Sequence, residues 1–565
     1  MPSLRASITV DCDRWLGELR RIWASIGFDE INWTYTGRGK ALFATLHELA
    51  ETPYYVRNHN TFTSGNALSA PARGSTNAYY ELPGGTPGYS WEIIDRVFDT
   101  HVAHGFHPIV ELGFMPIDLV ASSVSDDDWL RDVGEETYES DGLWKSPPKD
   151  YGRWSELIYQ LVSHCVSRYG AAEIRRWRFE VWNEPNLPNY WRGTVDEYCQ
   201  LYDHSVFGAT RALVDVKIGG PAIADPDQEA SRRFLRQFLG HCASGTNYAT
   251  GERGARLSFV SFHTKGAHYA RRRYYNLHGP FRRESPSSAA MLQDIRAGLA
   301  TISEFPEFAH LPVLVDECDP AVGTIYGVHD NPNFVITNNE YYPAFLVALV
   351  KRILDLDCNP GNRVELMTTW AFLFEGKRLF EGNRTLVTNE NIQKPILNAF
   401  RALARLGHMR ILAASDRSRD PATAPGSAEI DVLASRSGDK VTVLVWHQAD
   451  EWWAEGCADV SLTIDNLPFS GVARVRHYRI DSEHSNAYQA WVRMGAPDDP
   501  SVGQVAHLKS RQGLELFEPP ARHAVSASRQ LFLEFAIPMF GVSLLEIEPA
   551  HPGSLSERPP VAEEE

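Results

Sequence analysis

The chain has 565 residues and a mass of 63.5 kDa, and 43% of its residues are hydrophobic and 22% are charged. This balance excludes a disordered or collagen-like protein, and the length predicts more than one domain. The formal net charge of −17 argues against a nucleic-acid partner, because phosphates would be repelled rather than neutralised.

The seven cysteines are scattered along the chain, and none of them forms a CxxC pair. This pattern argues against a disulfide framework and against a structural zinc site. The N-terminus carries no apolar signal-peptide core, and no run of about 18 apolar residues predicts a transmembrane helix. We therefore expect a cytoplasmic protein without a membrane partner.

Eight short apolar runs alternate with longer helical stretches between about residues 27 and 406. Several runs are almost continuously apolar, which is typical of parallel strands buried on both faces. In chain order the runs are 27–34, 54–58, 107–113, 177–184, 216–220, 257–263, 311–317 and 364–370.

The stretches between these runs have helical spacing. One begins at Ser90, and another begins at Thr194 with Glu197 three residues later, which is a capping-box pattern. Two further helices are predicted over about 340–354 and 393–406. Eight strand–helix pairs of this kind predict an α/β fold, the (β/α)8 TIM barrel.

The pattern outside the barrel region divides the chain further. Residues 407–550 alternate strands and turns, which predicts an accessory all-β sandwich beside a barrel over residues 21–406. The strand-like N-terminal segment in residues 1–20 is expected to join that sandwich. The polar insertion 114–150 is expected to be a functional or mobile loop, and the acidic tail 551–565 is expected to be disordered.

Two glutamates stand at the ends of predicted strands. The motif FEVWNEP places Asn183 and Glu184 at the end of the fourth strand, and VLVDECDP places Glu317 at the end of the seventh. In a (β/α)8 barrel the carboxyl ends of all strands line one mouth, so these glutamates should face one cleft. Glycosidic cleavage needs two such carboxyl groups, one protonated to assist the leaving oxygen and one ionised to attack.

A structural role is the alternative for each glutamate, since a lone Glu at a strand end more often forms a salt bridge or a cap. The combination of WNEP with a second Glu at a matching strand end favours catalysis over that alternative.

These segments resemble glycoside hydrolase family 39, the β-xylosidase and α-L-iduronidase family. The matching segments include VRNHN, FEVWNEPNL, FVSFHTKGA, VDECDPAVG, WAFLFEG, NRTLVTN and RIDSEHSNAYQAWVRMG. The resemblance implies a barrel with an accessory β-sandwich, retention of anomeric configuration, an oligosaccharide substrate, and no metal or organic cofactor. It leaves a homo-oligomer possible.

The resemblance also implies roles for single residues. Glu184 corresponds to the acid/base, Glu317 to the nucleophile, and Asn183 to the residue that hydrogen-bonds the sugar 2-hydroxyl. The other substrate-binding positions that it implies are His59, His263, Lys265, Trp370 as an apolar platform, and Glu375. Each has an alternative structural role without the resemblance. The His could satisfy a buried backbone group, the Lys could stay solvated, and the Trp could pack in the core.

Two sets of features point to different sugars. HTKG, with Lys265, and NRTL, with Arg384, resemble iduronidase segments in which these cations bind a uronic carboxylate. However, TTWAFL has Thr369 and Trp370 where iduronidases carry an Asp, and DSEHSNAYQAWVRMG looks like bacterial xylosidases. We therefore expect a retaining exo-acting β-xylosidase that releases xylose from the non-reducing ends of xylo-oligosaccharides, as in xylan degradation. An iduronidase-like or arabinosidase activity is the alternative.

Other functional classes explain fewer of these features. A non-catalytic carbohydrate-binding protein would need neither Glu184 nor Glu317. A metal-dependent barrel hydrolase would need His and Asp clusters at strand ends, such as an HxH motif after the first strand, and the sequence has none there. A scaffold role would leave WNEP unexplained.

Overall fold

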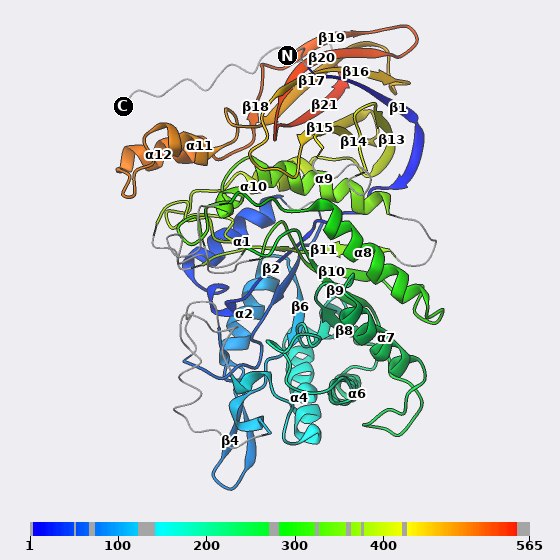
Figure 1. The fold of residues 1–565 in the computed structure, drawn as a ribbon, viewed down its shortest axis with the longest axis vertical. Helices are drawn as coiled ribbons and strands as arrows, with labels where there is room; N and C mark the ends of the chain where they lie inside the picture. Colours follow the sequence, from blue (N-terminus) through cyan, green and yellow to red (C-terminus); the bar gives the residue numbers. More distant parts are fainter. Residues whose placement is uncertain are drawn as a thin grey trace.

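The computed structural model describes residues 4–49, 52–66, 74–121, 142–269, 282–322, 327–356, 363–374, 378–420 and 427–550. A parallel barrel sheet ringed by helices carries a second, mixed sheet at one side (Figure 1). This arrangement confirms the predicted (β/α)8 barrel with an accessory β-domain.

The barrel sheet has nine strand segments because the eighth barrel strand is split in two. β11 (Val364–Met367) pairs with β10 on one side, and β12 (Thr369–Trp370) pairs with β2 on the other, so that the sheet closes. The other barrel strands are β2 (Ser25–Phe28), β3 (Tyr55–Asn58), β6 (His107–Leu112), β7 (Arg178–Val181), β8 (Ile218–Ile223), β9 (Val260–Lys265) and β10 (Val313–Asp319). All of their pairings are parallel, so their carboxyl ends open at one mouth.

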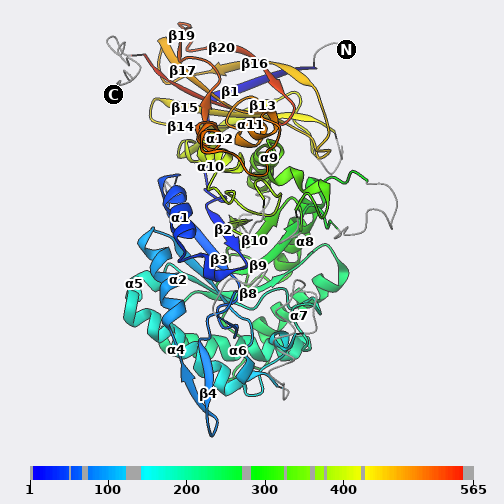
Figure 2. The ribbon, with the colours of Figure 1, turned by 90° about the vertical axis from the view of Figure 1, so that its left-hand side faces the viewer.

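Helices pack around this barrel, as Figure 2 shows. They are α1 (Gly37–Leu49), α2 (Glu92–Ala103), α4 (Tyr151–Tyr169), α5 (Ala171–Ile174), α6 (Val195–Ala212), α7 (Glu229–Ser244), α8 (Ser288–Ser303), α9 (Tyr341–Asp355) and α10 (Ile396–Ala404). The predicted capping box is confirmed, because Thr194 and Glu197 exchange side-chain and backbone hydrogen bonds at the start of α6. No helix among the described residues is long and apolar enough to span a membrane.

The first barrel strand differs from its predicted range. We expected a strand over 27–34, but β2 ends at Phe28, and Ile31–Trp33 form a 3-10 helix. The reason is the polar pair Asp29 and Glu30, which follows β2. Asp29 accepts a hydrogen bond of 3.0 Å from the Trp370 indole at the barrel mouth, so the chain turns there instead of extending the sheet.

The second sheet contains ten strands around its own apolar core. They are β1 (Leu4–Glu18), β13 (Met409–Ser415), β14 (Glu429–Ser437), β15 (Lys440–Gln448), β16 (Cys457–Asp465), β17 (Gly471–Ile480), β18 (Glu515–Leu516), β19 (Ala521–Val525), β20 (Leu531–Pro538) and β21 (Val542–Pro549). The N-terminal β1 lies between β13 and β16, antiparallel to the first and parallel to the second. Side chains of β15 and β20 share one core although four strands lie between these two in the order of the sheet, so the sheet folds back on itself.

The remaining described elements are shorter. They are the hairpin β4 (Tyr79–Leu82) and β5 (Thr86–Tyr89), the helices α11 (Ala487–Arg493) and α12 (Val502–Ser510), and the 3-10 turns Ile117–Leu119, Leu143–Lys145 and Pro332–Thr337. Residues 122–141 of the predicted insertion and the predicted tail 551–565 lie outside the described residues. We propose the division into a barrel over 21–406 and a β-domain over 407–550 as an interpretation of these two sheets.

Helix α9 joins the barrel to the second sheet (Figure 2). Arg352 on this helix forms an ion pair of 2.6 Å with Glu429, and the Tyr341 hydroxyl donates to the backbone oxygen of Asp450 at 2.8 Å. Buried side chains continue from the barrel helices into β15, where Leu444 and Trp446 belong to the same core. The second sheet is therefore packed firmly against the barrel.

Candidate active site

Two carboxylates meet at the carboxyl ends of β7 and β10. Oxygens of Glu184 and Glu317 and a ring nitrogen of His263 all lie within 4.8 Å of one another. Both glutamates are almost enclosed, with exposed fractions of 9% for Glu184 and 6% for Glu317. The structure therefore brings together the two residues that the sequence placed at separate strand ends.

The backbone before Glu184 takes an unusual course. Trp182 has a φ of 71° and Glu184 a φ of 44°, which is the left-handed region that side chains rarely adopt. Each such residue costs roughly 1–3 kcal/mol, and such strain gathers where a functional side chain must be aimed. The Glu184 amide donates to the Ala222 oxygen at 3.0 Å, so the carboxyl end of β8 holds this turn in place.

Cationic side chains surround Glu317. Its Oε1 accepts from Arg57 Nη1 at 3.0 Å, and its Oε2 accepts from Lys265 Nζ at 2.8 Å. Burial by itself would raise the pKa of Glu317, but Lys265, His263 and His59 together outweigh it and hold the pKa well below its usual range. Glu317 is therefore ionised at neutral pH, the state that a nucleophile requires.

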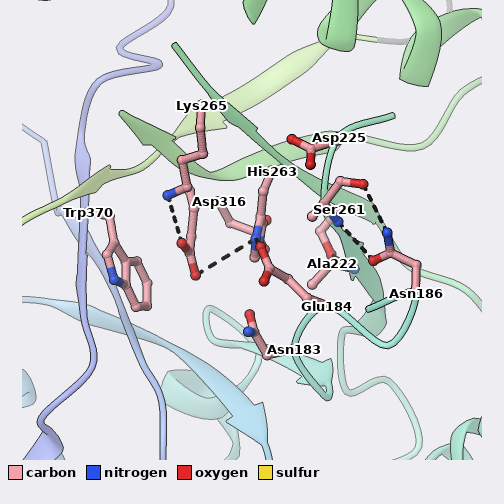
Figure 3. A network of polar contacts seen from close by, with 12 residues as sticks. Asn183, Glu184, Asn186, Ala222, Asp225, Ser261, His263, Lys265, Asp316 and Trp370 are labelled. Atoms are coloured by element: carbon pink, nitrogen blue, oxygen red, sulfur yellow. Dashed lines mark hydrogen bonds and ion pairs between the residues drawn. The ribbon is translucent and has the colours of Figure 1, made fainter. Parts of the chain in front are cut away.

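His263 connects the two carboxylates. Its Nδ1 lies 2.8 Å from Glu184 Oε1 and 3.8 Å from Glu317 Oε1, and its Nε2 lies 3.4 Å from Asp316 Oδ1. Figure 3 shows His263 on β9 and the neighbouring Asn183 and Glu184 after β7 directed toward the same space. The imidazole thus fixes the orientation of Glu184 beside Glu317.

His59 lies on the other side of Glu317. Its Nε2 is 3.3 Å from Glu317 Oε1, and its Nδ1 makes a very short contact with Glu111 Oε2. Burial would lower the pKa of His59, but the charge and hydrogen bond of Glu111 and the bond to Glu317 raise it to about 10. His59 is therefore a cation at neutral pH and adds positive charge beside Glu317.

Asn183 and Trp370 complete the described wall of the site. Asn183 Oδ1 accepts from Arg57 Nη2 at 2.9 Å, whereas its buried Nδ2 has no hydrogen-bond partner among the described residues. Trp370 is only 1% exposed, and its ring packs over Gly27, where an added Cβ would come within 2.2 Å of it. The Trp370 ring also lies 4.6 Å from the His59 ring, between centroids, and its edge faces the site in Figure 3.

Lys265 and Arg384 share one acidic partner. Lys265 Nζ lies 2.6 Å from Asp319 Oδ2, and Arg384 Nη1 lies 3.1 Å from the same oxygen. The two cations that pointed to a uronic substrate are therefore neutralised by the protein itself. The remaining predicted contact, Glu375, lies outside the described residues.

A buried charged cluster under the site was missing from the predicted set. Arg57 is fully buried and binds Glu180 through Nε at 2.6 Å, in addition to Glu317, and its Nη2 lies 3.3 Å from Glu111. Charged residues are rarely buried without partners. The Arg, Glu and Asp residues inside otherwise apolar strands therefore indicated that such a cluster could form. Arg57 thus pairs with Glu317 at the site and with the buried acids Glu111 and Glu180 beneath it.

Asp316 and Glu180 form an acidic pair inside this cluster. Burial and the neighbouring Glu180 raise the pKa of Asp316 well above its usual range. Burial would also raise the pKa of Glu180, but Arg57 and the hydrogen bonds from Asp316 and Ser261 together outweigh it and lower this pKa. Asp316 is therefore protonated and Glu180 ionised at neutral pH. A neutral Asp316 beside His263 Nε2 and next to Glu317 in sequence supports both site residues without adding another negative charge.

Glu184, His263 and Glu317 also have the ligand types and the closeness that a metal ion requires. The same closeness is what a pair of carboxyl groups needs to act on the two sides of one anomeric carbon. The expectation that no metal takes part stays a prediction, and it is tested below.

Comparisons with known proteins cover nearly the whole chain. Residues 21–523 match the family described as glycosyl hydrolases family 39. A β-xylosidase of Geobacillus stearothermophilus is 28% identical over 477 residues, which span 82% of this chain and 81% of that protein. An α-L-iduronidase of Mus musculus is 26% identical over 407 residues, which span 67% of this chain and 60% of that protein.

Solved structures show the same fold. A bacterial orthologue of human α-L-iduronidase superposes with a TM-score of 0.76 at 21% identity, over 97% of this chain and 84% of that chain. A β-xylosidase from Caulobacter crescentus superposes with a TM-score of 0.73 at 24% identity, over 96% of this chain and 100% of that chain. These likenesses support the architecture of a barrel with an accessory β-domain.

Proposed function

The chain belongs to glycosyl hydrolases family 39 and is a glycoside hydrolase, and we propose that it is a retaining exo-acting β-xylosidase. The observation that carries the proposal is the pair of carboxylates, whose oxygens approach within 4.8 Å. Retaining glycosidases hold their carboxyl groups about 5–5.5 Å apart, whereas inverting enzymes leave about 6.5–9.5 Å for a water molecule.

In the proposed cycle Glu317 is the nucleophile. Its carboxylate attacks the anomeric carbon while Glu184 protonates the leaving oxygen, which yields a covalent glycosyl-enzyme. Water then enters the vacated position, Glu184 takes its proton, and the sugar is released with its configuration retained. The cations around Glu317, which lower its pKa, favour its ionised form and so support this assignment.

Asn183 is suited to bind the sugar beside the nucleophile. Its amide nitrogen is buried and has no hydrogen-bond partner among the described residues, so it can donate to a sugar hydroxyl. A hydrogen bond of this kind that strengthens in the transition state lowers the barrier rather than only the KM. Trp370 would then supply the apolar surface next to the same sugar, with His59, His263 and Lys265 contacting its hydroxyls.

The preference for xylose over a uronic acid rests on Asp319. Its carboxylate already binds both Lys265 and Arg384, so a substrate carboxylate would have to approach this anion or displace it. Xylose carries no carboxylate and meets no such repulsion. A uronide is the second candidate, because both cations are nevertheless grouped next to Glu317.

The setting proposed for this activity is the breakdown of xylo-oligosaccharides in the cytoplasm. All six cysteines among the described residues are free and five of them are buried, which is usual in a reducing compartment. This location and the role in xylan degradation are proposals that rest on the chemistry of the chain.

A panel of nitrophenyl glycosides tests the proposal. Release of nitrophenol is measured from the β-xyloside, the α-L-iduronide, the α-L-arabinofuranoside and the β-glucoside, with Glu317→Ala as the inactive control. We expect the β-xyloside to have the highest kcat/KM, and NMR of the first product to show retained β-configuration. A higher kcat/KM for the iduronide, or an inverted first product, would overturn the assignment.

A further inference from the structure

A second pocket lies apart from the two carboxylates, between the barrel and the second domain. Its volume is about 490 Å³, within the range of about 300–1,000 Å³ typical of small-ligand pockets. Its walls come from the segments that follow β10 and β12, from α11 and the segment after it, and from Trp452 in the segment after β15. The lining residues relevant to ligand binding are His329, Arg378, Phe380, Tyr488, Trp491 and Asp498.

Aromatic rings form one wall of this pocket. The Phe380 ring lies 5.3 Å from the Trp491 ring and 5.4 Å from the Tyr488 ring, between centroids. Trp491 is held in place because its indole N–H donates to the Pro497 oxygen at 2.9 Å. Because the indole N–H already has a partner, Trp491 lines the pocket with the apolar face of a fixed ring. Such a face suits the C–H face of a sugar ring.

The rim of the pocket is polar and carries both signs of charge. His329, Arg378 and Asp498 are exposed, and their side chains make no hydrogen bond or ion pair with other described residues. A charged ligand would meet one group of like charge on this rim. A neutral ligand with many hydroxyls can accept from Arg378 and donate to Asp498 at the same time.

Two of the segments that line the pocket leave the barrel at the carboxyl ends of its strands, where the candidate site lies. β10 and β12, which precede these segments, carry Glu317 and Trp370 near their carboxyl ends. Phe380 is followed four residues later by Arg384, which binds Asp319. Four residues of extended chain reach at most about 14 Å, so the aromatic wall lies a short way from the site.

We propose that this pocket binds a neutral sugar unit of an oligosaccharide away from the bond that is cleaved. The inference rests on the proposed function for the class of sugar, a xylo-oligosaccharide. It goes beyond that function because it adds a second binding position that residues of the β-domain build. A longer substrate chain, or a separate oligosaccharide, would be held here by Trp491 and Tyr488.

Calorimetric titration of the full chain tests this inference. Glu317→Ala serves as the inactive background, and xylobiose and xylohexaose are the probes. Adding Trp491→Ala should weaken the binding of xylohexaose about tenfold, a loss of about 1.4 kcal/mol. The matched control is Trp15→Ala, since Trp15 is a 47% exposed Trp on β1, outside the pocket lining, and this change should leave the affinity unaltered.

Substitutions of exposed rim residues test the pocket with little risk of misfolding. Arg378→Ala and Asp498→Ala remove rim groups without structural partners, so each should fold and should weaken xylohexaose binding by severalfold while kcat/KM for nitrophenyl xyloside stays unchanged. Unaltered xylohexaose affinity in all three pocket variants would overturn the inference. Loss of xylobiose binding as well would also overturn it, because xylobiose bound at the two carboxylates is too short to span both positions. One binding event per protein would indicate one continuous chain, and two would indicate a separate oligosaccharide.

Failure of the proposed function gives a different result. If the glycoside panel identifies another sugar, the titration is repeated with oligosaccharides of that sugar. A tenfold loss in the Trp491→Ala variant would then support the pocket although the xylosidase assignment is wrong, and an unchanged affinity would overturn the pocket as well.

Discussion

The ammonium group of Lys265 lies 2.6 Å from Asp319 Oδ2, and the same nitrogen donates to Glu317 at 2.8 Å. Burial would lower the pKa of Lys265, but Asp319 and Glu317 outweigh it and raise it, so that the side chain stays charged. One cation thus serves two purposes, because it balances Asp319 and keeps Glu317 ionised. This relationship connects the choice of sugar with the reactivity of the nucleophile.

Lys265→Met should move the acid limb of the pH profile. Glu317 must be ionised to attack, and its pKa is low partly because Lys265 stands beside it. Without that charge the pKa of Glu317 rises, so kcat/KM should begin to fall at a higher pH than in the unaltered protein. The measurement is kcat/KM for nitrophenyl β-xyloside between pH 3 and pH 8. An acid limb at the same pH in both proteins would contradict this account.

Glu184→Ala should separate substrates by their leaving groups. General acid catalysis contributes roughly 10²–10⁴-fold, so hydrolysis of xylobiose should fall by about that factor. Dinitrophenyl xyloside needs no protonation to leave, so formation of its glycosyl-enzyme should be nearly unimpaired and visible as a burst. Equal losses for both substrates would show that Glu184 is not the acid.

Asp316→Asn should be tolerated better than Asp316→Leu. Because Asp316 is neutral beside Glu180, an amide of the same shape can still donate a hydrogen bond, whereas Leu leaves Glu180 with less support. We expect kcat within about threefold of the unaltered protein for Asn and a loss of more than about tenfold for Leu. These changes raise the activation free energy by at most ~0.7 kcal/mol and by more than ~1.4 kcal/mol, respectively. The KM should change little in either case. Equal kcat values for the two variants would contradict the hydrogen-bonding role.

His59 should make stability depend on pH above neutrality. Its folded pKa is about 10, above that of an unfolded histidine near 6.5. Its contribution to the free energy of unfolding is therefore complete below about pH 6.5 and is lost as the pH rises toward 10. Urea unfolding at pH 6.5 and pH 9.5 should show a smaller decline for His59→Gln than for the unaltered protein. An identical decline would assign the pH dependence to other groups.

Removal of divalent metal ions should not affect turnover. Glu184, His263 and Glu317 could serve as ligands, but the proposed cycle uses both carboxylates for bond making and proton transfer. Dialysis against EDTA should leave kcat/KM unchanged, and added Zn²⁺ should inhibit by occupying the two carboxylates. A loss of activity on chelation that Zn²⁺ or Mg²⁺ restores would replace the proposed mechanism with a metal-dependent one.

Much of the barrel was predictable because its signals are local. Buried parallel strands are apolar along their whole length, and the run at 107–113 became β6 (His107–Leu112) almost without change. The Thr194 capping box marked the start of α6 by its own residues. The first strand was misplaced because Asp29 turns the chain through a contact with Trp370, which lies at the opposite end of the barrel sequence.

The candidate site was predictable only in part. WNEP and the strand-seven Glu mark two positions, and closure of the barrel then obliges them to share a mouth. The partners of Arg57 were not predictable, since Glu111, Glu180 and Glu317 come from three other strands that lie far from Arg57 in the sequence. Which acid accepts which proton depends on distances that no local pattern contains.

The sequence by itself determined the class of the molecule, because strand and helix periodicities and the two glutamate motifs are properties of short segments. Tertiary structure alone decided the electrostatics of the site. Lys265 and Arg384 have the same identity whether they bind a substrate carboxylate or Asp319, and only folding brings Asp319 Oδ2 within 3.1 Å of both. Charge interactions act through space in a buried, weakly screened environment, so they follow from the fold and cannot be read along the chain.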